Sequence, residues 1–95
     1  MTNKPRILIP EFIIAAAVVS NNTCIALQPP ARHGDCIKVA SELNPSVFIL
    51  PEHQGFVTSH LRFVQRVEAK RIATAAQQLL ERASKSDELF SEDLW

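Results

Sequence analysis

Runs of apolar residues bounded by turn-forming residues predict five short strands. They are expected at residues 12–19, 23–27, 46–50, 55–58 and 62–64. Asn21 and Asn22 tolerate positive φ, so they favour a tight turn that joins the first two strands into a hairpin. A helix stays open as the alternative for residues 12–19, because this segment contains three alanines. The last two strands are expected to be joined by a bend at Ser59 and His60.

Two further segments repeat their apolar residues at helical spacing. The first is expected to begin near Gly34, with Asp35 as its N-cap, and to end at Leu43 before an Asn-Pro pair. The second is expected over residues 66–83, where alanine, isoleucine and leucine form one apolar stripe. This pattern predicts a single α+β domain over residues 1–95, with a small antiparallel β-sheet and two α-helices.

The first turns of the second helix contain three cations, at Arg66, Lys70 and Arg71. Cations are disfavoured there because the helix dipole places partial positive charge at the N-terminus. Their presence is consistent with an anion nearby.

Both ends of the chain differ from its centre. Residues 1–11 contain prolines at positions 5 and 10 and predict an extended lead-in, with an edge strand as one alternative. Residues 84–95 predict an acidic docking tail, because an apolar set at its end is suited to packing against the body or a neighbouring subunit. That set is Leu89, Phe90, Leu94 and Trp95.

The charge balance limits the classes of partner. Ten basic and ten acidic side chains give a formal net charge of zero, whereas proteins that bind nucleic-acid polymers generally carry a basic excess. The acidic side chains are concentrated after residue 80, so the remainder is mildly basic and suits a small anionic ligand. No apolar run approaches the roughly 20 residues of a membrane span. We therefore expect a cytoplasmic protein without nucleic-acid or membrane partners, and its two cysteines are expected to be free thiols.

The first candidate site is Arg32-His33-Gly34-Asp35, at the expected start of the first helix. A helix N-terminus presents unpaired N–H groups that can bind phosphate, and Arg32 can add a two-pronged contact. His33 can donate a hydrogen bond or stack. The alternative is an ordinary loop in which Asp35 caps the helix and Arg32 points to water.

The second candidate site lies between Gln54 and Phe63. Nucleotides are bound by aromatic stacking, by amide and hydroxyl hydrogen bonds and by arginine contacts to phosphate. This segment contains all of these groups, and its candidate residues are Gln54, Gly55, Phe56, Thr58, Arg62 and Phe63. The alternative is that both phenylalanines belong to the core. Arg62 is the residue that this alternative explains least.

Metal binding and catalysis have little support in the sequence. His33 and Cys36 have the spacing of a zinc-binding pair, but no second close pair accompanies them, so we expect no metal. No phosphate-binding glycine loop, nucleophile elbow or His-Glu-x-x-His motif is present. We therefore expect a binding protein that needs no cofactor, not an enzyme.

Two segments carry a resemblance to known phage proteins. They are QGFVTSHLRFVQRVEAKRIA at residues 54–73 and ELFSEDLW at residues 88–95. Together they resemble the first Thoeris anti-defence family, whose members act as sponges for cyclic ADP-ribose isomers and, in some cases, cyclic oligonucleotides. The resemblance covers roughly residues 12–95. It departs from the family at Gln65, where an acidic residue is more usual, and near Leu61, where the turn lacks a glycine or an acidic residue.

The resemblance implies a compact α+β protein that forms a homo-oligomer and binds a cyclic nucleotide signal in the cytoplasm of an infected bacterium without cleaving it. It assigns ligand contacts to the candidate residues of both sites, with Arg32 and Arg62 essential. It also implies that Ser91 and the neighbouring acidic pair shape a pocket between subunits. The competing hypothesis is a small phage inhibitor that docks on a host defence enzyme or CRISPR component through its C-terminal apolar residues.

Overall fold

The first two strands form the predicted hairpin. In the computed structural model, which describes residues 3–95, β1 (Ile13–Ser20) pairs antiparallel with β2 (Thr23–Leu27). Asn21 and Asn22 form the turn with φ values of 50° and 61°. A two-residue turn with both φ values positive matches the twist of the flanking strands. The strand prediction for this segment is therefore confirmed, and the helical alternative is wrong.

The sheet has four antiparallel strands in the order β2-β1-β3-β4. β3 (Gln54–Thr58) pairs with the other side of β1, and β4 (Phe63–Gln65) pairs with β3. The turn between β3 and β4 includes Leu61 at a φ of 59°. The two predicted strands in this region are present, and each boundary differs from its prediction by one residue at most.

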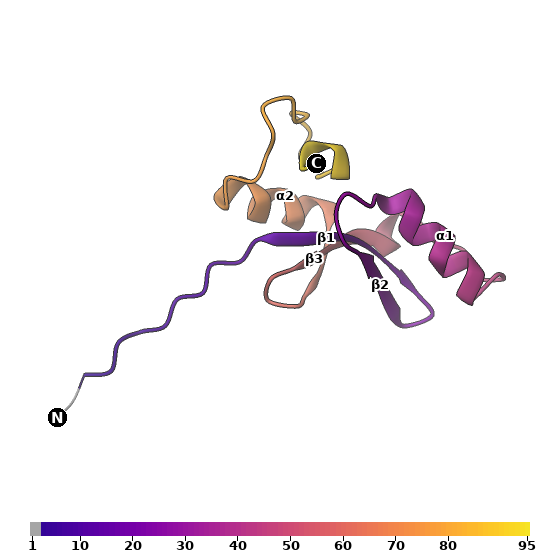
Figure 1. The fold of residues 1–95 in the computed structure, drawn as a ribbon, viewed down its shortest axis with the longest axis horizontal. Helices are drawn as coiled ribbons and strands as arrows, with labels where there is room; N and C mark the ends of the chain where they lie inside the picture. The colour runs from indigo at the N-terminus through magenta and orange to yellow at the C-terminus, as the bar shows by residue number, and fades with distance from the viewer. Residues whose placement is uncertain (1–2) are drawn as a thin grey trace.

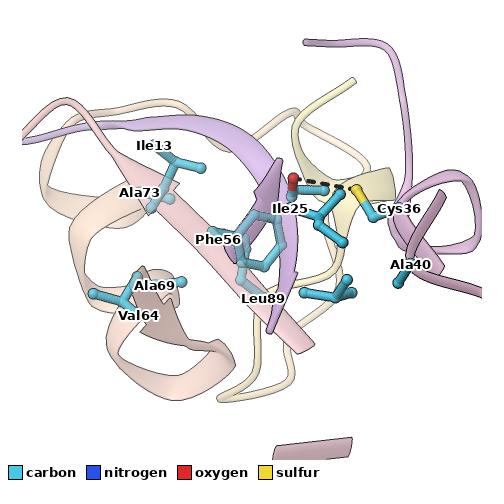
Figure 2. Packing of buried hydrophobic residues seen from close by; sticks show 11 residues of the cluster. Ile13, Ile25, Cys36, Ala40, Phe56, Val64, Ala69, Ala73 and Leu89 are labelled. Carbon is cyan, nitrogen blue, oxygen red and sulfur yellow. Dashed lines mark hydrogen bonds between the residues drawn. The ribbon is translucent and has the colours of Figure 1, made fainter. Parts of the chain in front are cut away.

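One face of the sheet carries the core. Cross-strand partners share a face, so Val18 with Ile25, and Phe56 with Val64, place their side chains together. The two helices cover this face: Figure 2 shows Cys36 and Ala40 from the first helix and Ala69 and Ala73 from the second around Phe56. The predicted fold class, an α+β domain with a small antiparallel sheet and two helices, is confirmed.

The first helix, α1 (His33–Leu43), begins one residue earlier than predicted, and Asp35 is not its N-cap. Arg32 occupies the N-cap position. Asp35 stands at the third helical position, where its carboxylate accepts a hydrogen bond of 2.8 Å from the backbone N–H of Arg32. An acidic side chain therefore already compensates the partial positive charge at this helix end.

The second helix, α2 (Arg66–Ala75), ends eight residues before its predicted end. The helical pattern continues, but Gln77 adopts a φ of 58° and breaks the helix. The side-chain amide of Gln78 then accepts a hydrogen bond from the backbone N–H of Ile13 at 2.7 Å and donates one to its carbonyl at 2.8 Å. This contact with the start of β1 replaces another helical turn, so tertiary structure overrides local propensity.

The prediction of a strand at residues 46–50 is wrong. This segment runs without helix or strand between α1 and the short 3₁₀ helix Pro51–His53, and it pairs with no strand of the sheet. Its side chains nevertheless alternate as in a strand: Val47 and Ile49 are partly buried, while Phe48 and Leu50 are exposed.

The two ends of the chain behave differently. Residues 3–10 form an extended arm that projects from the body on the side away from α1 (Figure 1). It is not an edge strand of the sheet. The C-terminal segment instead folds over the body through the 3₁₀ helix Ser91–Asp93. Leu89 is fully buried there, and Leu94 and Trp95 pack against the core.

Candidate functional site

Arg62 is bound by two carboxylates of its own chain. Its guanidinium donates to both carboxylate oxygens of Glu11, at 2.8 and 2.9 Å, and to Glu68 at 3.0 Å. Thr58, which is fully buried, donates its hydroxyl hydrogen bond to the same Glu11 carboxylate. Hydrogen bonds from Arg62 and then from Thr58 lower the pKa of Glu11 to about 2. Arg62 and Thr58 thus join the start of β1 to the β3–β4 turn.

Arg32 holds the C-terminal segment. Its guanidinium donates to the carbonyl oxygen of Trp95 at 2.6 Å and to the hydroxyl of Ser91 at 3.2 Å. It also lies 3.5 Å from the Glu92 carboxylate. The indole N–H of Trp95 completes the contact by donating to the carbonyl of Ala31 at 3.1 Å.

Three further candidate residues meet in the core. The His33 Nε2–H donates to the carbonyl oxygen of Gly55 at 2.7 Å, and the His33 ring lies edge-on to Phe56 with centroids 4.9 Å apart. Burial lowers the pKa of His33 and so favours the neutral imidazole, whereas the hydrogen bond to the Gly55 carbonyl opposes this shift. Phe56 is fully buried, so its ring has no free face on which a base could stack.

Gly55 permits a close approach between β3 and β4. A Cβ atom at this position would lie 2.1 Å from the carbonyl oxygen of Val64 and 2.8 Å from the ring of Phe63. Any side chain would therefore push the two strands apart. Gly55, a candidate ligand contact, thus lies against a neighbouring strand.

The remaining two candidates, Gln54 and Phe63, line a groove beside the β4 edge of the sheet. Its volume is about 730 Å³. Its other walls come from the 3₁₀ helix before β3, from the first turns of α2 and from the C-terminal segment. The charged side chains that line it are Glu52, Arg66, Glu68, Arg71 and Glu88.

Arg66 is the unusual cation of this groove. It is partly buried at the start of α2, where it donates to the carbonyl of Leu89 at 2.9 Å and to the side-chain oxygen of Gln54 at 3.1 Å. Its guanidinium also lies 5.1 Å from the centroid of the Phe90 ring. Among residues 3–95, no carboxylate lies within 4.0 Å of it. Burial lowers the pKa of Arg66, yet arginine stays charged at neutral pH.

The candidate residues therefore fall into separate places. Gln54 and Phe63 share the groove, Thr58 and Arg62 share the Glu11 contact, and the other four lie in the core or at the C-terminal contact. Arg66 was not assigned a ligand contact from the sequence, although its position in the first turn of a helix was the available signal. Its partners, at positions 54, 89 and 90, become visible only in the folded chain.

The C-terminal apolar residues face inward. Leu89 is buried in the core, Phe90 packs on Arg66, and Trp95 is fixed by Ala31 and Arg32. The anchor that the docking hypothesis requires is thus occupied by the protein itself.

The part of the chain that the structure describes contains neither a cluster of metal ligands nor a membrane-spanning helix. No group of three or more histidine, cysteine or acidic side chains there is arranged to hold a metal ion. No helix in that part is long and apolar enough to cross a membrane.

Comparison with known proteins places the chain in a phage family. Residues 12–95 match the phage T4 y16D protein family. The chain belongs to this family. The match includes all four strands and both helices and leaves out the extended arm. No curated protein and no solved structure matches the chain.

Proposed function

We propose that this member of the phage T4 y16D family binds a cyclic nucleotide in the groove at Arg66 and sequesters it without cleavage. The ligand class is that of immune second messengers, namely cyclic ADP-ribose isomers or cyclic oligonucleotides, in the cytoplasm of the infected host. The observation that carries the proposal is the partly buried Arg66, which faces the groove without a carboxylate partner.

A phosphate supplies what Arg66 lacks. Arg66 is hydrogen-bonded only to neutral acceptors, although the charges of Glu88 and Glu92 act on it from a greater distance. Its guanidinium can bind two phosphate oxygens at once. Arg71, five residues further along α2, lines the same groove and provides a second positive charge. A ligand with two phosphates can therefore contact both arginines.

The rest of the groove suits the sugar and base of a nucleotide. Phe63 offers a partly exposed ring for stacking, and Gln54 and Gln65 offer amide groups for hydrogen bonds. The volume lies within the range of about 300–1,000 Å³ that is usual for small-molecule sites. Glu52 and Glu88 repel phosphate but can accept hydrogen bonds from ribose hydroxyls or base amines. They therefore favour an orientation in which the phosphates lie at the arginines.

Retention of the intact ligand is supported by the chemistry of the lining. Among the described residues, the side chains that line the groove include no hydroxyl, thiol or imidazole group. Nucleophilic attack on phosphorus or on a ribose carbon would need such a group, or a carboxylate that attacks directly or activates a water. Of the three glutamates that line the groove, Glu68 is bound by Arg62. Recovery of the intact ligand tests whether Glu52 and Glu88 stay inactive.

The direct test is a thermal-shift screen of the full chain against cyclic ADP-ribose isomers and cyclic di- and trinucleotides. A ligand present at a hundredfold excess over its Kd stabilises the folded state by about 2.7 kcal/mol. Chromatography and mass spectrometry of the released ligand should show the compound that was added. Absence of a shift with every compound, or recovery of a cleaved product, would contradict the proposal.

A further inference from the structure

The chain contains two strand-like segments that have no strand partner. One is the arm, whose Ile7, Leu8 and Ile9 are 87, 85 and 65% exposed. The other is residues 47–50, here called the receiving segment, in which Phe48 is 85% exposed. Neither pairs with any strand in the part of the chain that the structure describes. Isolated exposed segments of this composition are templates for pairing with another chain.

From these features we infer that the arm of one copy pairs with the receiving segment of a second copy as an added antiparallel strand. The partner is thus the protein itself, and the contact produces a homodimer or a larger closed assembly. The receiving segment ends next to Pro51 and Glu52, which line the Arg66 groove, but the inference does not depend on the proposed ligand.

The two segments are complementary in side-chain pattern. In an extended arm, Ile7 and Ile9 lie on one side and Leu8 on the other. In the receiving segment, Phe48 and Leu50 are the exposed pair. Pairing of the two strands covers this exposed pair with Ile7 and Ile9. Leu8 then faces the groove of about 260 Å³ that Ile37, Val47 and Ile49 help to line.

Charge fixes the direction of pairing. Arg6 precedes the apolar residues of the arm, and Glu52 follows the receiving segment. Both side chains belong to exposed residues. An antiparallel arrangement brings Arg6 to the end of the receiving segment where Glu52 lies, whereas a parallel arrangement separates them. Opposite charges at the rim of an interface favour the correct register.

The arm cannot pair with the receiving segment of its own chain. Figure 1 shows that the arm leaves the body on the side opposite α1, from whose C-terminal end the receiving segment follows. The base of the arm is fixed, because His60 hydrogen-bonds the carbonyl of Ile9 at 2.6 Å and Glu11 is bound by Arg62. The free part, residues 3–8, spans on the order of 20 Å when extended, and it points away from the body. In a dimer, each copy can place its arm on the receiving segment of the other copy.

The test is the molar mass of the purified full chain in solution, measured by light scattering and by sedimentation over a range of concentrations. The wild-type protein should form dimers or larger species. Ile7→Asp removes the arm contact and Phe48→Asp removes the receiving surface, so each variant should weaken self-association by at least roughly tenfold. Leu61→Asp is the matched control, because Leu61 is also an exposed apolar residue (82%) but belongs to neither segment.

Mixing the two variants gives the decisive result. Ile7→Asp retains an intact receiving segment, and Phe48→Asp retains an intact arm, so an equimolar mixture should form a one-to-one complex that neither variant forms alone. Circular dichroism should show the same melting temperature for both unmixed variants, since the substituted residues are exposed. A monomeric wild-type protein, variants of unchanged mass or a mixture that does not associate would each overturn the inference.

Discussion

Arg62 and Arg66 lie four residues apart, yet the fold places them in opposite chemical environments. Arg62 is shared by Glu11 and Glu68, whose carboxylates hold it at the surface. Arg66 is partly buried and is held by a backbone carbonyl, an amide oxygen and an aromatic ring. The first guanidinium forms ion pairs with two carboxylates, whereas the second is hydrogen-bonded to neutral groups alone, with Glu88 and Glu92 acting on it from a greater distance.

Under the proposed function, Arg62 has a structural role and Arg66 contacts the ligand. Hydrogen bonds to the two carboxylates raise the pKa of Arg62 above its ordinary value, which stabilises its charged form within the protein. Burial lowers the pKa of Arg66. A phosphate bound at Arg66 would compensate that loss of hydration, whereas a phosphate at Arg62 would have to displace a carboxylate.

The largest effect is expected from Arg66→Ala. The variant should lose at least roughly thirtyfold in ligand affinity, because truncation of a charged hydrogen-bond donor costs about 2–5 kcal/mol. It should also lose about 2 kcal/mol of folding stability, since the carbonyl of buried Leu89 loses its donor. Calorimetric titration and chemical denaturation measure the two effects. Ligand affinity within threefold of wild type would show that Arg66 is not a ligand contact.

A smaller and more specific effect is expected from Gln54→Glu. The side-chain oxygen of Gln54 already accepts a hydrogen bond from Arg66 at 3.1 Å. A glutamate at this position would place a carboxylate there, so Arg66 would gain an ion pair like those of Arg62. Ligand affinity should fall roughly tenfold, or about 1.4 kcal/mol, while the melting temperature stays the same or rises. Gln54→Met is the matched control, because it keeps the length of the side chain without adding charge. Equal affinity for the Glu and Met variants would contradict the electrostatic argument.

Arg62→Ala should have little effect on binding. Its ion pairs are at the surface, where such pairs contribute little to stability because solvent screens them. We therefore expect a slightly lower melting temperature and a ligand affinity within about threefold of wild type. Calorimetric titration of this variant beside Arg66→Ala compares the two arginines directly. Loss of binding in Arg62→Ala alone would reverse their assigned roles.

The smallest effect is expected in the pH dependence of folding stability, through the contact between Glu11 and Arg62. The pKa of Glu11 is lowered from 4.5 to about 2 in the folded protein. Its stabilising contribution is therefore present above pH 4.5 and is lost as the pH falls from 4.5 towards 2. Thermal melting of Glu11→Gln over this range should show a weaker decline than wild type, with binding at neutral pH unchanged. An identical decline in both proteins would show that Glu11 does not contribute.

The parts of the fold that were predicted correctly depend on local signals. Asn21 and Asn22 determine the hairpin turn through their own backbone preferences, and the stripe of alanines marks α2. The end of α2 was not predictable in the same way, because it depends on contact between Gln78 and Ile13, 65 residues apart. The extended residues 46–50 have strand-like composition, but a strand also requires a neighbour, which the sheet does not provide.

The candidate site shows the same limit. Gln54 and Phe63 were singled out from the sequence, and both line the groove. The residues next to Arg62 in the sequence give no reason for an arginine at this position. The reason lies in its main partner, Glu11, which is 51 residues away and so is not evident from the sequence. Arg66 was noted only for its unfavourable place in the helix dipole. That signal is local, whereas the lack of a carboxylate within 4.0 Å of Arg66, among residues 3–95, is a property of the folded chain.

The central claim is that Arg66, and not Arg62, meets the ligand. It is tested most directly by NMR of the arginine Nε–Hε groups, assigned by single substitution, during titration with the cyclic nucleotide that gives the largest thermal shift. We predict that the Arg66 resonance moves with a saturating dependence on ligand concentration while the Arg62 resonance stays in place. A moving Arg62 resonance beside a stationary Arg66 would contradict the claim.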